Sequence, residues 1–260
     1  MVALVYNTRG TEKDNIDSSI PPQDPHCIRI VCISDTHGSI RFNVPDGDIL
    51  VHAGDITKNS NMKEFTTFAN WMETLPHKIK IVIAGNHDLV MDTEYFFPSQ
   101  RTSVLQEKEH VLRMFKEKGI IYLENTSFRL PPSLGGFLVY GSPYSPVHIG
   151  GAFMPEDLSD VWSSIPSDTD ILVTHTPPHG IQDTARNGKH AGCKYLLKAI
   201  KEIKPKVCIF GHIHEAFGVH EEEDTVYVNA CISNYRYRAV QPAVALDLSK
   251  PIGDDSCSQQ

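Results

Sequence analysis

The sequence predicts an α/β protein built on mixed β-sheet, and three observations support this fold class. Short apolar runs rich in Ile and Val recur along the chain, as buried strands do. Segments with helical periodicity lie between them. Strands alternate with helices in the first part of the chain and follow one another in the last part. With 260 residues, the chain is long enough to bury a core without disulfide bonds.

Eight segments are expected to form strands, because each is a short apolar run dominated by residues that favour a pleated, buried surface. In chain order they span residues 28–34, 48–51, 79–84, 137–140, 170–174, 206–210, 225–228 and 243–248.

Three segments are expected to form helices, at residues 62–75, 103–118 and 192–204. The first repeats apolar side chains at steps of three and four residues. The second begins with Ser103 and Gln106, spaced as in a capping box, and ends before Gly119. The third has the same apolar spacing and stops before Pro205.

Polar segments flank the predicted domain, which spans residues 27–250. Residues 1–26 and 251–260 are expected to be tails. The six cysteines form no C-x-x-C pair, which is typical of a reduced protein inside the cell. The first 26 residues do not resemble a signal peptide, and no apolar run approaches the ~20 residues that span a bilayer. We therefore expect a cytoplasmic protein without membrane contact.

The formal net charge is −8 and the isoelectric point is about 5.9. This balance argues against non-specific binding of nucleic acid. Basic side chains do gather in residues 186–206, where the simplest interpretation is the solvated face of a helix.

Side chains suited to metal ions follow five of the predicted strands. In open α/β sheets, binding sites form at the carboxyl ends of the strands. Carboxylates are hard oxygen ligands, and imidazoles suit zinc, iron and manganese. Each fragment alone could be a turn or a cap, but the five together predict a metal site. The residues are Asp35, His37, Asp55, Asn86, His87, Asp88, His175, His212 and His214.

Three glycines, Gly54, Gly85 and Gly211, stand beside these residues and allow the backbone to approach the ligands closely. Because no cysteine belongs to the set, a structural thiolate zinc site is not expected.

The ordered motifs D-x-H, G-D, G-N-H-D, H and G-H-x-H resemble those of the calcineurin-like metallophosphoesterase superfamily. They span residues 35–214, which is most of the chain. The stretches "GDILVHAGDIT", "GSPYSP" and "VNAC" resemble the metallophosphoesterase-domain-containing branch. That branch includes phosphodiesterases and is related to bacterial (class III) cyclic-nucleotide phosphodiesterases.

The resemblance implies four layers, with two facing mixed β-sheets flanked by helices. It also implies a pair of divalent metals, for which Mn, Fe, Zn and Mg are all acceptable and Mn is favoured. Every ligand position is filled in this chain. The first metal would bind Asp35, His37 and His214, the second Asn86, His175 and His212, and Asp55 would bridge both.

The implied reaction is hydrolysis of a phosphate ester by attack of a metal-bridging hydroxide. His87 is expected to contact the substrate phosphate and protonate the leaving group. Asp88 would either orient His87 or only complete the turn. Asn86, Tyr144 and His179 are expected to be further substrate contacts.

We expect a phosphodiesterase for cyclic nucleotides or related small diesters. A phosphomonoesterase, including a protein phosphatase, is the alternative, because it needs the same metal centre. Protein phosphatases of the superfamily carry arginines near the G-D motif, whereas Lys58 stands here three residues after Asp55. A non-catalytic scaffold is opposed by the complete ligand set, and a nuclease by the acidic balance.

Overall fold

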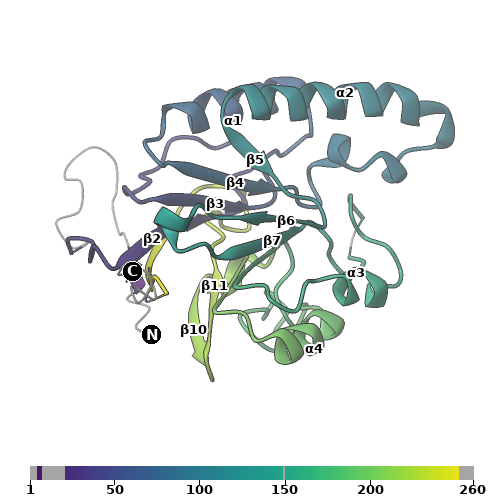
Figure 1. Cartoon of the computed structure of the whole chain (residues 1–260). Helices are drawn as coiled ribbons and strands as arrows, with labels where there is room; N and C mark the ends of the chain where they lie inside the picture. The colour runs from purple at the N-terminus through teal and green to yellow at the C-terminus, as the bar shows by residue number, and fades with distance from the viewer. Residues whose placement is uncertain (1–4, 8–20, 149, 252–260) are drawn as a thin grey trace, which may run out of the picture.

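The computed structural model describes residues 5–7, 21–148 and 150–251, and it has four layers (Figure 1). Two six-stranded sheets face each other, α1 and α2 cover the outer face of one, and α3 and α4 that of the other. The four-layer fold expected from the motifs is therefore confirmed. No helix in the described ranges is long and apolar enough to cross a membrane.

In each sheet, four neighbouring strands run parallel. The first sheet has the order β1-β12-β2-β3-β4-β5, in which β12 is antiparallel to both neighbours. The second has the order β10-β11-β9-β8-β7-β6, with antiparallel pairs at its two edges. The first comprises β1 (Val5–Asn7), β2 (Cys27–Ile33), β3 (Ile49–Ala53), β4 (Ile79–Ile83), β5 (Ile120–Tyr122) and β12 (Val244–Ser249). The second comprises β6 (Thr126–Arg129), β7 (Leu138–Ser142), β8 (Ile171–Thr174), β9 (Val207–Phe210), β10 (Gly218–Glu222) and β11 (Thr225–Asn229).

The strands are apolar on both faces because each face meets another layer. Ile28 and Ile30 of β2 belong to the cluster between the two sheets, whereas Val31 and Ile33 pack beneath α1 and α2. This alternation follows from the two-residue period of a strand. It explains why the central strands read as continuous apolar runs.

The helices lie close to the predicted segments, with one difference at α2. They are α1 (Met62–Thr74), α2 (Pro98–Glu117), α3 (Ser159–Ser163) and α4 (Lys194–Ile203), with short 3₁₀ turns at Leu89–Met91, Thr93–Tyr95, Pro132–Leu134 and His214–Ala216. Asn61 and Glu64 form a capping box at the start of α1. The capping box predicted at Ser103 is wrong, because α2 begins at Pro98, a residue suited to the first helical position.

Five short elements were not predicted: β1, β5, β6, β10 and α3. β6 and β10 are largely polar strands at a sheet edge, so they lack an apolar run. β1 falls within the segment expected to be a tail and pairs with β12. In the same segment, the Pro21 carbonyl accepts a hydrogen bond from Arg29. The boundaries of the expected tails stay a prediction, and residues 252–260 lie outside the described ranges.

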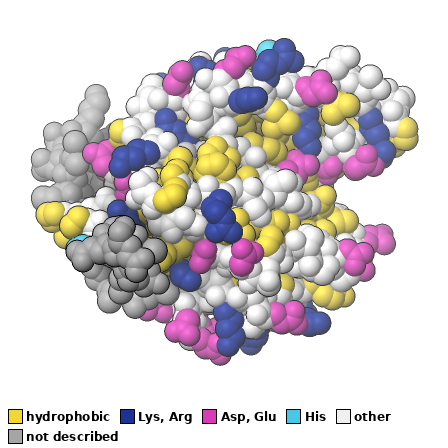
Figure 2. Space-filling view, viewed as in Figure 1, with side chains coloured by type: hydrophobic (Ala, Val, Ile, Leu, Met, Phe, Trp, Pro, Cys, Tyr) yellow, Lys and Arg dark blue, Asp and Glu magenta, His cyan; other side chains and the backbone are white. Residues whose placement is uncertain are grey.

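Surface charges of both signs are interspersed on the face shown in Figure 2. The basic stretch at 186–206 divides in the structure. Arg186 and Lys189 precede α4, whereas Lys194, Lys198 and Lys201 belong to it.

A buried ion pair joins β2 to β12. The Arg29 guanidinium donates two hydrogen bonds of 2.7 Å to the two carboxylate oxygens of Asp247. Their side chains are only 7% and 5% exposed. Arg29 and Asp247 are also register partners across the strands, so the pair fixes the alignment of β12 on β2.

The Asp247→Ala substitution is expected to destabilise the protein by about 3–5 kcal/mol, because it removes the carboxylate that balances a buried guanidinium. Urea denaturation would measure the loss. As the control, Asp168→Ala breaks the exposed pair with Arg129, in which the side chains are 66% and 58% exposed. That change should cost about 0–1 kcal/mol. Equal effects of the two substitutions would contradict this account.

Candidate metal centre

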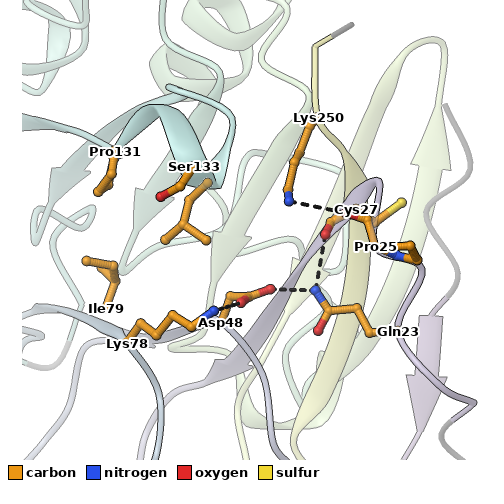
Figure 3. Close-up of a pocket in the computed structure, with 10 residues that line it drawn as sticks. Gln23, Pro25, Cys27, Asp48, Lys78, Ile79, Pro131, Ser133 and Lys250 are labelled. Atoms are coloured by element: carbon orange, nitrogen blue, oxygen red, sulfur yellow. Dashed lines mark hydrogen bonds and ion pairs between the residues drawn. The ribbon is translucent and has the colours of Figure 1, made fainter. Parts of the chain in front are cut away.

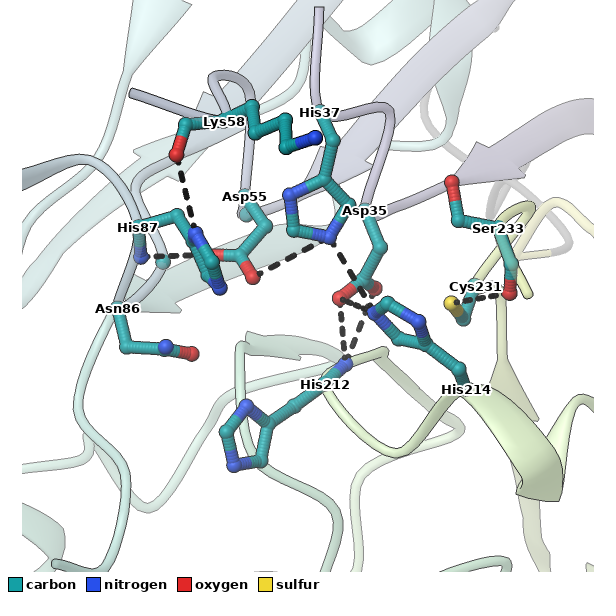
Figure 4. Close-up of polar contacts among 12 residues, drawn as sticks. Asp35, His37, Asp55, Lys58, Asn86, His87, His212, His214, Cys231 and Ser233 are labelled. Carbon is teal, nitrogen blue, oxygen red and sulfur yellow. Dashed lines mark hydrogen bonds and ion pairs between the residues drawn. The ribbon is translucent and has the colours of Figure 1, made fainter. Parts of the chain in front are cut away.

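The five predicted motif segments meet at one edge of the two sheets. Figure 4 labels Asp35, Asp55, Asn86 and His212 among their residues. Loops after β2, β3 and β4 of the first sheet carry one half of the predicted ligands. Loops after β8 and β9 of the second sheet carry the other half. The first half is Asp35, His37, Asp55 and Asn86, and the second is His175, His212 and His214.

One group of donors gathers around Asp35. The Nε2 atom of His214 lies 3.3 Å from Asp35 Oδ1 and 3.3 Å from Nε2 of His37. His37 Nε2 in turn lies 3.6 Å from Oδ2 of Asp55. Two imidazole nitrogens and two carboxylates therefore converge, a donor set that suits a divalent cation.

A second group gathers on the other side of Asp55. The Nε2 atom of His175 lies 3.4 Å from Asp55 Oδ1 and 3.0 Å from Oδ1 of Asn86. The ring of His212 packs edge-on against that of His175, with centroids 4.9 Å apart. Figure 4 shows the His212 ring directed away from Asp35, to which only its backbone N–H is bonded.

Asp55 thus faces both groups with different oxygen atoms. Oδ2 is directed to His37 and Oδ1 to His175, and the residue is only 2% exposed. A carboxylate in this position can bridge two cations.

Backbone carbonyls orient three of the imidazoles. The Nδ1 atoms of His37, His175 and His214 lie 3.3, 2.9 and 3.0 Å from the carbonyl oxygens of Thr57, Ala53 and Asn234. A carbonyl only accepts hydrogen bonds, so Nδ1 must donate. In the neutral rings Nε2 is then free to bind a metal, an arrangement usual for metal-ligating histidines.

Positive charge on two of the histidines would balance the buried carboxylates. Burial opposes charge on His175, but Asp55 and Asp35 raise its pKa to about 9. Burial also opposes charge on His214, yet its contact with Asp35 raises its pKa to about 9. By contrast, burial lowers the pKa of His37 to about 4. Divalent cations would take over this balance, because ligands bind metals in their deprotonated form.

The backbone is strained at four of the predicted ligands. The φ angles of Asp35, His37, Asp55 and His212 are 55°, 46°, 55° and 68°. They lie in the left-handed region, which residues other than glycine rarely adopt. Such strain persists only where the surrounding structure enforces it, and it concentrates at functional sites.

Two glycines make room for the ligands. A Cβ atom on Gly211 would lie 2.1 Å from Asp35 Oδ2, and one on Gly54 would lie 2.4 Å from His175 Nδ1. Gly54 also has a φ of +99°. The close backbone approach expected at these glycines is therefore present.

The contacts of Asp88 favour its turn role over orientation of His87. Its carboxylate accepts hydrogen bonds from the backbone N–H groups of Gly85, Ile56 and Thr57, at 2.9, 3.1 and 2.9 Å. Burial, together with the charge of Asp55, raises the pKa of Asp88 to about 6. Asp88 thereby ties the loop after β3 to the loop after β4.

His87 borders the first group of donors and is half-buried. Its ring lies edge-on to His37, with centroids 4.7 Å apart, and its Nδ1 atom is 3.2 Å from the Lys58 carbonyl oxygen. Together with His37 and Asp55 it forms a group whose donor atoms all lie within 4.8 Å of one another. The geometry allows His87 to act on the substrate or to bind a metal.

Tyr144 and His179 pack against aromatic rings that do not belong to the predicted metal ligands. Tyr144 packs against Phe153, with ring centroids 5.5 Å apart. His179 packs against His190, also at 5.5 Å. Their contact with substrate stays a prediction.

Two residues at the site escaped sequence reasoning. Tyr237 packs against His37 with ring centroids 4.6 Å apart, and no motif in the sequence marks it. Cys231 shares a group of donor atoms with Asp35 and His214, all within 4.8 Å. Burial raises the pKa of the Cys231 thiol well above its usual value, which disfavours the thiolate form that binds metals. Its only sequence signal was the "VNAC" stretch.

A separate hollow of about 540 Å³ lies at the opposite, amino-terminal ends of β2, β3 and β4 (Figure 3). Its charged groups are already paired: Lys78 with Asp48 at 2.9 Å, and Lys250 with the Pro25 carbonyl at 3.2 Å. It offers no cluster of metal ligands or nucleophiles comparable to the site.

Comparisons with known proteins agree with this geometry. The family model for calcineurin-like phosphoesterases matches residues 28–216. Metallophosphoesterase domain-containing protein 1 of Homo sapiens is 37% identical over 246 residues, covering 88% of this chain and 74% of that protein. Probable rhamnogalacturonate lyase C of Emericella nidulans is 42% identical over 195 residues, but the match covers only 17% of that protein. Among solved structures, a phosphopantetheinyl hydrolase from Mycobacterium tuberculosis shares the fold, with a TM-score of 0.51, 12% identity and coverage of 91% of this chain and 100% of that chain.

The four-layer fold and the converging Asp, His and Asn donors define a metal-dependent phosphoesterase. The family match spans most of the chain, and the human relative is similar along most of its own length. The chain belongs to the calcineurin-like phosphoesterase family. This membership implies a centre for two metal ions, and the residues present in this chain fit such a two-metal centre.

The Gly211→Ala substitution is expected to weaken metal binding by about 10- to 100-fold, because the added Cβ would displace Asp35. Titration of the metal-stripped protein with Mn²⁺ would measure the change. Gly119→Ala is the control, since a Cβ there meets nothing within 4 Å, although its φ of +69° carries strain of its own. Unchanged affinity in a folded Gly211→Ala protein would show that Asp35 is not a ligand.

Proposed function

We propose that this chain is a phosphodiesterase that hydrolyses small phosphodiesters, cyclic nucleotides among them, with two divalent cations. The observation that carries the proposal is the placement of Asp55, whose two oxygens face two separate donor groups. A site built to hold one cation has no need of the second group.

The proposed ligand roles follow the two groups. Asp55 would bridge the cations, with Asp35, His37 and His214 on one side and Asn86, His175 and His212 on the other. When bound, such cations lower the pKa of water and offset charge on the phosphoryl oxygens. Manganese is the favoured ion, because carboxylate and imidazole ligands both suit it.

His87 would contact the phosphate and protonate the leaving oxygen. Its backbone N–H donates to Asp55 Oδ1 at 2.8 Å, and the Lys58 carbonyl lies beside its Nδ1. The segment is therefore held at two points while the ring remains half-buried at the site. A leaving alkoxide requires a proton, and a positioned histidine is a common donor.

One feature favours a diester over a monoester substrate, whereas the proposed proton donor suits both. The segment after the bridging Asp55 carries Lys58 in place of the arginine that protein phosphatases of the superfamily place there. The proposed proton donor, His87, suits an alkoxide leaving group. Nucleoside diesters release an alkoxide, and so do sugar phosphates, which are monoesters. The choice between diester and monoester therefore depends on experiment.

Metal-stripped protein reconstituted with Mn²⁺ is expected to hydrolyse bis-para-nitrophenyl phosphate faster than the mono-ester. The panel should include 2′,3′- and 3′,5′-cyclic nucleotides. Faster turnover of the mono-ester would replace the proposal with a phosphomonoesterase. Failure to turn over any substrate, with two metals bound per chain, would favour a non-catalytic scaffold.

The His87→Ala substitution is expected to lower kcat for cyclic nucleotides by about 10²- to 10⁴-fold. The loss should be smaller for bis-para-nitrophenyl phosphate, because nitrophenolate leaves without a proton. Metal content per chain should be unchanged. The control His110→Ala alters an exposed histidine on α2 and should leave turnover intact. Loss of a metal ion from His87→Ala would identify His87 as a ligand.

A further inference from the structure

A tight turn at residues 234–238 borders the metal centre. The Asn234 side chain accepts hydrogen bonds from the backbone N–H groups of Arg236 and Arg238, at 2.9 and 3.2 Å. The Asn234 carbonyl accepts another from the Tyr237 N–H at 2.8 Å. Tyr237 has a φ of 58°, in the left-handed region. These bonds give the turn one defined conformation, which fixes the positions of its side chains.

The turn is joined directly to the predicted ligands. The Asn234 carbonyl also orients His214, whose Nδ1 atom is 3.0 Å away. The ring of Tyr237 lies against His37, His87 and His214, with centroid distances of 4.6, 5.5 and 5.8 Å. The turn lies beyond residues 28–216, the part matched by the family model. It is therefore placed to contact the part of a substrate that extends past the scissile phosphate.

Three cations lie against the aromatic rings of this turn, and we call Lys58, Arg186 and Arg236 the cationic rim. The Lys58 ammonium lies over the Tyr237 ring, 5.2 Å from its centroid. The guanidinium groups of Arg186 and Arg236 lie 4.6 and 5.1 Å from the centroid of the Tyr235 ring. The aromatic rings hold these cations by cation–π contact.

The rim carries uncompensated positive charge. In the part of the chain that the structure describes, none of the three cations forms an ion pair with a carboxylate. Two guanidinium groups beside one ring repel each other, in a chain whose formal net charge is −8. A bound anion would reduce this repulsion.

We propose that the cationic rim binds a second phosphoryl group of the substrate, in addition to the diester that is cleaved. This inference rests on the proposed phosphodiesterase function and narrows its substrate class. Guanidinium groups bind phosphate oxygens through paired, charge-assisted hydrogen bonds. The second phosphoryl group is either a terminal phosphate on a nucleotide or the next link of an oligonucleotide.

The test compares matched esters of one nucleoside. The para-nitrophenyl ester of thymidine 5′-phosphate is measured with and without a 3′-phosphate, in the presence of Mn²⁺. In the wild-type protein, the 3′-phosphate should lower KM by about tenfold. In the Arg186→Gln/Arg236→Gln protein, the ratio of the KM values without and with the 3′-phosphate should fall below about twofold. Arg113→Gln, at an exposed position on α2, should keep the wild-type ratio.

A binding measurement gives the same comparison without turnover. Calorimetric titration with thymidine 3′,5′-bisphosphate and thymidine 5′-phosphate should show tighter binding of the bisphosphate, and the double variant should lose this preference. A third ester, with a dinucleotide 3′ extension, identifies the source. A gain from the terminal phosphate alone indicates a nucleotide substrate, and an equal gain from the internal link indicates an oligonucleotide.

Equal KM values for the two thymidine esters in the wild-type protein would contradict the proposed subsite, as would a ratio kept in the double variant. Either result leaves the phosphodiesterase function standing if both esters are hydrolysed. Failure to hydrolyse any diester would instead contradict the proposed function, and the bisphosphate preference would still test the rim.

Discussion

The structure depends on the compensation of two buried carboxylates. Asp35 is 0% and Asp55 2% exposed, and ionised carboxylates in such positions are costly unless opposite charge surrounds them. In this chain, His175 and His214 contact the two carboxylates and have raised pKa values, and the ends of β8 and β9 deliver them. The left-handed backbone at Asp35 and Asp55 and the bare glycines beside them are local costs of that arrangement.

Much of the fold and of the site could be predicted from the sequence, because both depend on local patterns that repeat. Each central strand is buried on both faces, so residues such as Ile30 and Val31 produce an unbroken apolar run. The loops that follow these strands meet at one sheet edge, which is why donors as distant as Asp35 and His212 could be grouped from their position after a strand.

The remaining features depend on contacts that leave little local signal. β10 is a polar edge strand, recognisable only by its pairing with β11. The helix α2 begins at Pro98, whereas the capping-box pattern at Ser103 predicted a later start. The structural role of Asp88 depends on hydrogen bonds from backbone N–H groups in the loop after β3. Tyr237 reaches the site because Asn234 shapes its turn, a relation that composition does not reveal.

The division of the ligands between the two sheets makes the centre a product of their assembly. The contact of His212 with Asp35 joins residues 177 positions apart. Neither sheet alone holds the full set of predicted ligands, so a complete two-metal centre would require both sheets. Ions that bind only the assembled state stabilise it in proportion to their affinity. Cations bound at the centre would therefore also hold the two sheets together, so the metal site would contribute to the assembly of the fold.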